Sequence, residues 1–299
     1  MKIMKPAYLQ LGSEELKKRV DILYKKMKSC DICPRKCRVN RLSGQIGACR
    51  VTNLPSVASY GPHFGEESFL VGQNGSGTIF FNGCNLSCIY CQNWTISQVH
   101  TDEEITIEQL ANIMLKIQTI GCHNLNLVTP THQIAMIIHA LSIAIKDGLN
   151  IPIVYNCGGY ESVETLQLLN GVVDIYMPDF KYGDDALALK YSGVHDYVKI
   201  ATDALKEMYK QVGGLKIENT ITMRGVFVRH LVLPNDISRT EKVFEIISSI
   251  STEIPVNVMN QYHPTYKAYN CPELSRRISQ AEYMKAIEMA KRYGLTIIN

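Results

Sequence analysis

Six short apolar segments alternate with amphipathic segments along most of the chain. The apolar segments cover residues 77–83, 124–129, 151–159, 172–181, 225–234 and 254–262. Helical apolar spacing is found in residues 13–28, 105–121, 132–148, 162–171, 184–211, 237–250 and 274–293. Strands separated by helices predict a parallel sheet. We therefore expect an α/β fold in which the parallel sheet curves into a full or partial barrel, with its active site at the carboxyl ends of the strands.

The region before the first of these strands differs from the rest. It contains one amphipathic helix and then a loop with four cysteines, and it offers little apolar core of its own. We divide the chain into a cysteine-rich amino-terminal appendage, residues 1–54, and a barrel, residues 55–299. The glycine-rich residues 72–77 resemble a phosphate loop, but they precede a strand and do not open a helix, so they predict a turn.

Charge and hydropathy exclude several classes of protein. The net charge of the 299-residue chain is +3, and basic and acidic residues alternate without a basic helix face, so no nucleic-acid partner is expected. The apolar segments are too short to cross a membrane. The first residues are charged where a secretory signal needs an apolar core, which predicts a cytoplasmic protein.

Seven of the ten cysteines fall into two groups. In a reducing cytoplasm, grouped cysteines favour metal binding over disulfides. The later group, Cys84, Cys88 and Cys91, has the spacing C-x3-C-x2-C directly after a predicted strand. Three thiolates on one loop can hold three corners of a 4Fe–4S cluster and leave the fourth iron open. A zinc site completed by a histidine such as His100 is the alternative.

The sequence around these cysteines, GCNLSCIYCQN, resembles the radical S-adenosylmethionine (SAM) superfamily. With VASYGPHFGEE, VTPTH and NQYHP, it is similar to the pyruvate formate-lyase activating enzymes. The resemblance implies a partial (β/α)6 TIM-like barrel, and an oxidoreductase in which a 4Fe–4S cluster reductively cleaves SAM to a 5′-deoxyadenosyl radical that abstracts a hydrogen atom. It also implies an electron donor such as flavodoxin or ferredoxin, and a glycyl-radical enzyme or another protein as substrate.

The resemblance also assigns candidate contacts to SAM. The usual Gly-Gly-Glu stretch after the second strand is replaced here by VTPTH, whose Thr129, Thr131 and His132 offer alternative acceptors. Thr129 or Thr131 could instead cap the following helix, and Tyr90 could simply pack in its loop. The alternative for the candidates at strand ends is a satisfied polar residue: Asn156, Asp179, Lys181, Arg229 and His263. The other candidates are Tyr90, Asn93, Asn156, Asp179, Lys181, Arg229 and His263.

The earlier group of cysteines has the spacing C-x2-C-x3-C-x11-C. Four thiols are enough for a closed site, either a structural zinc ion or a second 4Fe–4S cluster. Nearby basic residues could dock an acidic electron donor. The members of this group are Cys30, Cys33, Cys37 and Cys49.

Three functions remain open from the sequence. The first is a glycyl-radical activase, and the second is a radical SAM enzyme that acts on a small molecule or peptide. The third, of a different class, is a zinc-binding interaction module that does not cleave SAM. Cys122, Cys157 and Cys271 are isolated and predict buried apolar positions, although Cys157 follows a strand and could face the site.

Overall fold

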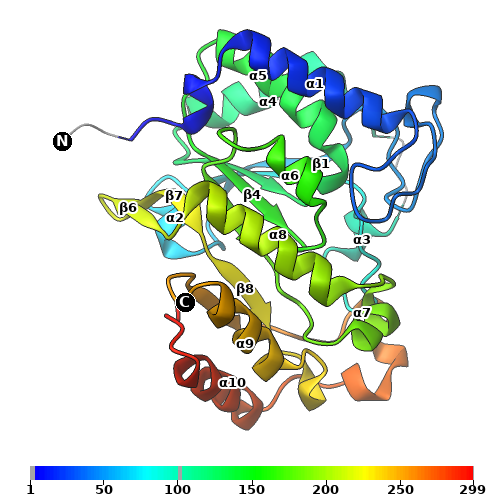
Figure 1. Ribbon diagram of the computed structural model, residues 1–299, viewed down its shortest axis with the longest axis vertical. Coiled ribbons are helices and arrows are strands. Elements are labelled where there is room, and N and C mark those ends of the chain that lie inside the picture. Colours follow the sequence, from blue (N-terminus) through cyan, green and yellow to red (C-terminus); the bar gives the residue numbers. More distant parts are fainter. Residues whose placement is uncertain (1–3, 100–102, 299) are drawn as a thin grey trace.

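The computed structural model describes residues 4–99 and 103–298 (Figure 1). Its main sheet has seven strands in the order β1-β2-β3-β4-β5-β7-β6. From β2 to β7 the strands of this sheet run parallel, whereas β1 and β6 pair antiparallel at its two edges. The strands are β1 (Val57–His63), β2 (Ser76–Phe81), β3 (Leu125–Val128), β4 (Ile153–Cys157), β5 (Ile175–Pro178), β6 (Lys216–Glu218) and β7 (Ile221–Val226).

A second pair of parallel strands continues the curve of the sheet. It consists of β8 (Val228–Leu231) and β9 (Val256–Met259). The chain passes from β7 to β8 through Phe227 alone, and a bridge between Asp179 and Arg229 joins β8 to the end of β5. The six strands predicted from the sequence are therefore confirmed, with the fifth divided between β7 and β8, and the expected partial barrel is found.

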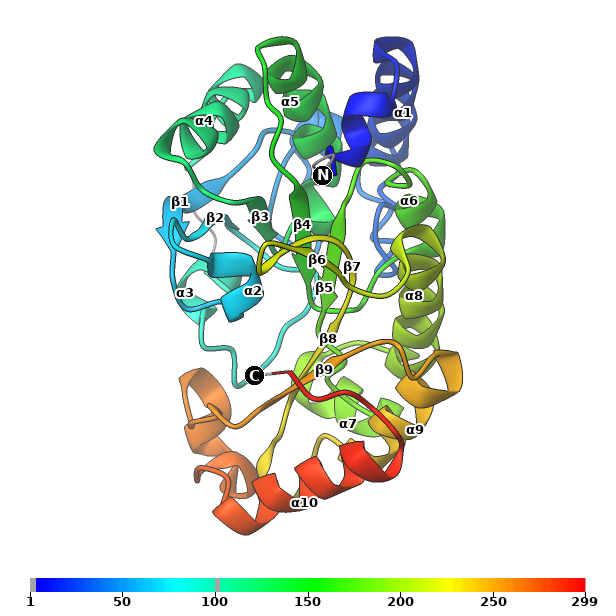
Figure 2. The same cartoon turned by 90° about the vertical axis from the view of Figure 1, so that its left-hand side faces the viewer.

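Helices cover the outer face of this curved sheet (Figure 2). Each long helix lies in a segment whose apolar spacing predicts it. For example, the Thr106 side chain caps α4, and Gly121 ends it in the left-handed conformation. The helices are α1 (Ser13–Met27), α2 (Ser68–Val71), α3 (Trp94–Ser97), α4 (Ile107–Ile120), α5 (Ile134–Lys146), α6 (Val163–Gln167), α7 (Asp185–Ser192), α8 (Tyr197–Val212), α9 (Thr240–Ile250) and α10 (Gln280–Arg292).

Two parts of the sheet do not follow from the sequence pattern. The edge strand β1 lies outside the apolar segments predicted as strands, because Gly61 and Pro62 interrupt it and none of its residues is buried. The β6–β7 hairpin was likewise not predicted, since β6 has only three residues and no buried face. Both are edge features, where pairing with a neighbour decides the structure more than burial does.

The amino-terminal appendage packs on the barrel. Helix α1 lies beside α5 (Figure 1), and its buried residues Leu16, Leu23 and Met27 belong to the same apolar cluster as the strands. The Tyr8 hydroxyl donates a hydrogen bond of 2.8 Å to the carbonyl of Ile151. The apolar residues of the appendage are thus buried against the barrel and do not form a core of their own. The domain boundary after residue 54 stays a prediction.

Among the described residues, the helices are all too short or too polar to traverse a lipid bilayer.

Candidate functional site

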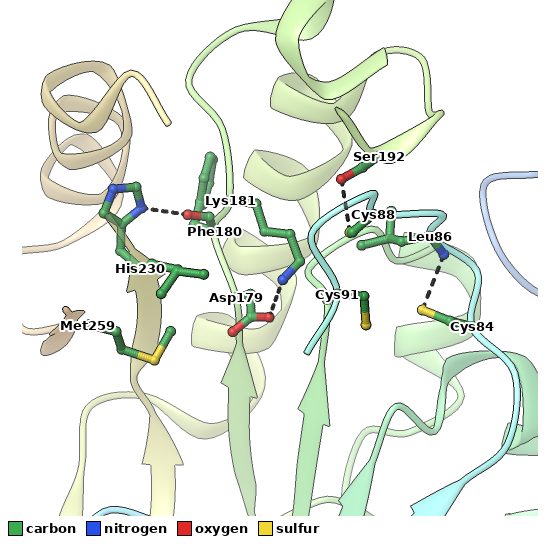
Figure 3. A network of polar contacts seen from close by, with 12 residues as sticks. Cys84, Leu86, Cys88, Cys91, Asp179, Phe180, Lys181, Ser192, His230 and Met259 are labelled. Carbon is green, nitrogen blue, oxygen red and sulfur yellow. Dashed lines mark hydrogen bonds and ion pairs between the residues drawn. The ribbon is translucent and has the colours of Figure 1, made fainter. Parts of the chain in front are cut away.

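A single cavity of about 1040 Å³ lies at the carboxyl ends of the parallel strands. The loop after β2 brings Cys84, Cys88 and Cys91 to its wall, and the segment after β5 brings Asp179 and Lys181 to the same cavity (Figure 3). Residues more than 80 positions apart in sequence therefore meet where a barrel of this type places its active site.

The three cysteines of this loop are held by short contacts. The Cys84 sulfur accepts the backbone N–H of Leu86 at 3.3 Å, and the Cys88 sulfur lies 2.9 Å from the Ser192 hydroxyl. Burial raises the pKa of the Cys88 thiol to about 11, although the positive charge of Lys181 opposes this shift. A thiolate here consequently needs a cation beside it, and a bound metal supplies one.

Asp179 and Lys181 form an ion pair at the cavity wall. The Lys181 Nζ lies 2.5 Å from Asp179 Oδ2. Burial is the largest single influence on the pKa of Lys181 and lowers it, but the charge and hydrogen bond of Asp179, together with Cys88 and Tyr197, raise that pKa well above its usual value. Lys181 is therefore permanently charged and held in place close to Cys88. Such a cation can bind an anionic group of a ligand.

Arg229 also lines the cavity, but it already has two anionic partners. Its guanidinium makes two hydrogen bonds to the Glu67 carboxylate, at 2.8 and 2.6 Å, and it is ion-paired with Glu66. The Asn257 amide donates to the same Glu67 oxygen at 2.8 Å. Burial works against the charge of Arg229, and the two carboxylates nevertheless raise its pKa. This geometry ties the segment before α2 to β8 and β9.

The sequence reasoning missed the roles of Glu66, Glu67 and Asn257. Glu66 and Glu67 form the end of VASYGPHFGEE, and their side chains are only 6% and 2% exposed. Two adjacent acidic residues ordinarily indicate an exposed loop, so the sequence alone gave no reason to expect burial. Asn257 was available as a signal, because it is a polar residue inside an apolar strand.

Tyr90 and Asn93 both line the cavity, in different environments. Tyr90 is buried, its hydroxyl lies 2.6 Å from that of Tyr182, and its ring packs edge-on against Tyr262. This is the loop-packing role that the sequence left open for it. Asn93 is exposed at the start of α3, where its side chain makes no cap hydrogen bond and is available to a ligand.

The structure separates the three residues of VTPTH. Thr129 lines the cavity, with a backbone φ of 59° that turns the chain sharply after β3. Thr131 and His132 instead point into the protein. The Thr131 hydroxyl donates to Glu161 at 2.6 Å, and His132 Nε2 donates to the Asn82 carbonyl at 2.8 Å. Because burial lowers the pKa of His132 to about 4, its ring is neutral.

The remaining candidates lie at or near the cavity. Asn156, at the end of β4, lines it, and so does the buried Cys157. His263 is outside the lining residues, at the rim, where its Nδ1 lies 3.3 Å from the Gln92 amide. Of the sequence-predicted contacts, the structure therefore brings seven side chains to the cavity wall: Tyr90, Asn93, Thr129, Asn156, Asp179, Lys181 and Arg229.

Glu161, the partner of Thr131, gives a prediction on stability. Burial raises its pKa to about 7, against hydrogen bonds from Thr131 and Tyr155 that lower it. Between pH 4.5 and 7 the unfolded chain releases this proton and the folded chain keeps it, so the group destabilises the fold as the pH rises. Glu161→Gln is expected to raise the free energy of unfolding above that of the wild type by about 2 to 3 kcal/mol more at pH 8 than at pH 5. Urea unfolding of both proteins at the two pH values measures this difference. A gain that is equal at both pH values would contradict this account.

Within the described part of the chain, no three His, Cys, Asp or Glu side chains gather closely enough to hold one metal ion. A 4Fe–4S cluster is a different case, because each thiolate binds a separate iron. His100, the alternative zinc ligand, lies outside the described residues.

Comparisons with known proteins identify a family for this chain. Residues 78–245 match the family model of the radical SAM superfamily. An uncharacterised protein of Methanocaldococcus jannaschii is 37% identical over 290 residues, which cover 94% of this chain and 79% of that protein. A second uncharacterised protein of the same organism is 24% identical, with 86% of this chain and 79% of that protein covered.

Two solved structures share the fold. Methylornithine synthase superposes with a TM-score of 0.50 at 15% identity, over 96% of this chain and 75% of its own. A radical SAM methyltransferase from Sphaerobacter thermophilus gives a TM-score of 0.51 at 14% identity, over 74% of this chain and 65% of its own. With its cysteine loop at the carboxyl ends of a partial barrel, and the family model matched over more than half its length, this chain belongs to the radical SAM superfamily.

Proposed function

We propose that this enzyme abstracts a hydrogen atom from a substrate that binds in the same cavity as SAM. The observation that carries the proposal is the shared cavity itself. Cys84, Cys88 and Cys91 face it together with charged side chains, and its volume of about 1040 Å³ is at the upper end of the range for ligand pockets. That volume offers room for SAM and for a further reactant beside it.

The residues present fit a 4Fe–4S cluster and SAM. Three sulfurs on one loop line the cavity from one side, which suits a cluster with one iron left open to the cavity. When bound, the reduced cluster supplies the electron that cleaves SAM to methionine and a 5′-deoxyadenosyl radical. The protein's part is to orient SAM and to keep water from the reacting atoms.

Lys181 is our candidate for the SAM carboxylate, and Asn156 for the ribose hydroxyls. Lys181 belongs to the network of Figure 3, its charge acts on the Cys88 thiol, and Asp179 fixes its position. Asn156 lies at the end of β4 and Thr129 directly follows the neighbouring strand β3. The Thr129 N–H donates to the Asn156 carbonyl at 2.8 Å, so the two strand ends are held together. Tyr90, which is buried, also lines the cavity.

Replacing Lys181 tests this role. Lys181→Gln is expected to raise the KM for SAM by about 10- to 100-fold, because a hydrogen bond to a charged group contributes about 1.5 to 3 kcal/mol. Iron content should not change. The matched control is Lys190→Gln, whose ion pair with Glu273 lies at the surface. An unchanged KM in Lys181→Gln would show that another group binds the carboxylate.

Two substrate classes follow from different features of the cavity. The exposed Phe64 at its edge offers an apolar contact to a partner protein, which supports hydrogen abstraction from a protein glycine as in the activases. The charged wall formed by Glu66, Glu67 and Arg229 supports a small polar molecule as the second candidate. An electron donor such as flavodoxin or ferredoxin is part of either proposal.

Deuterium transfer distinguishes the two classes. The reconstituted enzyme is given SAM, dithionite and either the small-molecule or the protein fraction of a deuterated cell extract, and the 5′-deoxyadenosine is analysed by mass spectrometry. Deuterium from the protein fraction supports the partner glycine, and deuterium from the other fraction supports a small molecule. 5′-Deoxyadenosine that carries no deuterium from either fraction would contradict the proposed hydrogen abstraction.

A further inference from the structure

The three sulfurs of the cysteine loop after β2 each have a polar partner. The Cys88 sulfur lies 2.9 Å from the Ser192 hydroxyl (Figure 3), and the Cys91 sulfur lies 3.2 Å from the Ser97 hydroxyl. The third sulfur accepts the backbone N–H of Leu86 at 3.3 Å. The two serines belong to α7 and α3, so the fold brings hydroxyl groups to the sulfurs that the C-x3-C-x2-C motif does not contain.

The Ser192 hydroxyl is the end of a chain of buried hydroxyl groups. The hydroxyls of Tyr90 and Tyr182 lie 2.6 Å apart, and that of Tyr182 lies 2.7 Å from Ser192 Oγ. Each hydroxyl has one proton to donate, and a cysteine bound to iron is a thiolate without a proton. With iron bound, all three contacts are hydrogen bonds only if the chain runs from Tyr90 through Tyr182 and Ser192 to the Cys88 sulfur.

Ser97 has the same arrangement at Cys91. Ser97 is only 6% exposed, and its oxygen accepts the Gln98 side-chain amide at 3.2 Å. The Ser97 proton is therefore left for the sulfur. The same Gln98 amide donates to the Leu86 carbonyl at 3.3 Å, which ties it to the cysteine loop. Both serines thus accept a hydrogen bond on the oxygen and have a sulfur beside them as the acceptor for their own proton.

The backbone fixes the position of Ser192. The carbonyls of Tyr191 and Ser192, at the end of α7, accept the N–H groups of Ile89 and Ser87 at 2.9 and 3.0 Å. Carbonyls at the end of a helix have no partner within the helix, so they are available to another segment. The end of α7 is consequently bonded to the residues on both sides of Cys88, which keeps the Ser192 hydroxyl next to that sulfur.

We propose that Ser192 and Ser97 raise the reduction potential of the 4Fe–4S cluster by donating hydrogen bonds to two of its cysteine sulfurs. This inference rests on the cluster site of the proposed function. The reduced cluster carries one more negative charge than the oxidised one, so a donor to its sulfurs stabilises the reduced state more. The two serines act through the ligands and are positioning residues. A higher potential allows a weaker electron donor to reduce the cluster.

The four cysteines of the appendage lie in a separate place. Cys30, Cys33, Cys37 and Cys49 line a space of about 10 Å³, which has room for about one water molecule and is too small for a cluster. The signal of a 4Fe–4S cluster in this protein is therefore assigned to the loop after β2. A structural zinc ion at the four thiols of the appendage stays a prediction.

A redox titration tests the proposal without SAM or substrate. The wild type, Ser192→Ala and Ser97→Ala are loaded anaerobically with iron and sulfide, and the reduced cluster is measured by electron paramagnetic resonance at fixed potentials. Each variant is expected to lower the ratio of reduced to oxidised cluster about tenfold, a shift of about 59 mV to lower potential for one electron. The control is Ser238→Ala, because Ser238 is also fully buried but donates to the Leu231 carbonyl at 2.9 Å. Its potential should equal that of the wild type.

Tyr182→Phe provides a second measurement. It keeps the Ser192 hydroxyl but removes the donor to its oxygen, so a smaller shift in the same direction is expected. The matched control is Tyr191→Phe, because the Tyr191 hydroxyl donates to Glu273 at 2.7 Å and has no place in the chain to Cys88.

An unchanged or higher potential in a cluster-loaded serine variant would overturn the proposal for that serine. If Ser192→Ala binds no cluster, Tyr182→Phe decides, and a potential equal to that of Tyr191→Phe would overturn the role of Ser192. The outcome does not depend on the reaction with SAM. Lower potentials in a protein that leaves SAM intact would support this inference and contradict the proposed function.

Discussion

Cys84→Ala is expected to abolish the cleavage of SAM. Cys84 lines the cavity with Cys88 and Cys91, and no other cysteine of that loop can take its place. Changes that only reorient metal ligands already reduce affinity or activity about 10- to 100-fold. Removing a ligand should therefore lower 5′-deoxyadenosine formation by more than about 100-fold. The measurement is anaerobic reconstitution, followed by iron analysis and chromatography of the products.

The matched control for this variant is Cys271→Ala. Cys271 is a half-buried cysteine distant in sequence from both groups, and it is not among the residues that line the cavity. Its replacement should leave iron content and product formation within about twofold of the wild type, because replacing a half-buried residue away from the site usually changes the stability of the fold little. Equal losses in the two variants would mean that general damage to the protein, and not the missing ligand, explains the effect.

Arg229→Met is expected to destabilise the protein by about 3 to 5 kcal/mol, the usual effect of removing one partner of a buried ion pair. The carboxylates of Glu66 and Glu67 would stay buried without their cation. Burial raises the pKa of Glu67, but the hydrogen bond and charge of Arg229, with the hydrogen bond of Asn257, hold it below the usual value. Without Arg229 the pKa should rise, so the loss of stability should be larger at pH 8 than at pH 5.

Urea unfolding of Arg229→Met beside Arg292→Met provides the comparison. Arg292 pairs with Glu241 at the surface, where both side chains are at least half exposed, and its loss should change stability by less than about 1 kcal/mol. Adding Glu67→Gln to Arg229→Met should recover part of the lost free energy of unfolding, since it removes a buried carboxylate that has no cation beside it. If both arginine variants lose the same stability, the buried pair does not have the role described here.

The strands and helices were predictable because buried apolar residues recur along the sequence at the spacing of a strand or a helix. Residues 124–129 and 153–157 are apolar because β3 and β4 are covered on both faces, and α4 and α5 carry apolar residues at helical spacing. The loop with Cys84 was predictable for a different reason, since its spacing reflects the ligands that a cluster needs. Edge strand β1 has neither signal, because none of its residues is buried.

Contacts between distant segments were beyond the reach of the sequence. Arg229 and Glu67 are 162 positions apart, and only the curvature of the sheet brings them together. The directions of Thr129 and Thr131 were equally undecidable, because one left-handed residue, Thr129, turns the chain so that they face opposite sides. Sequence gave the residue types of the site, whereas the fold decided which of them reach the cavity.

The most direct test of the account is the reaction of the wild-type protein with SAM. The protein is loaded anaerobically with iron and sulfide and reduced with dithionite, and methionine and 5′-deoxyadenosine are then measured. The site formed by Cys84, Cys88 and Cys91 predicts that both products appear together and only after reduction. Intact SAM in the presence of a fully loaded and reduced cluster, with or without cell extract as a source of substrate, would contradict the account.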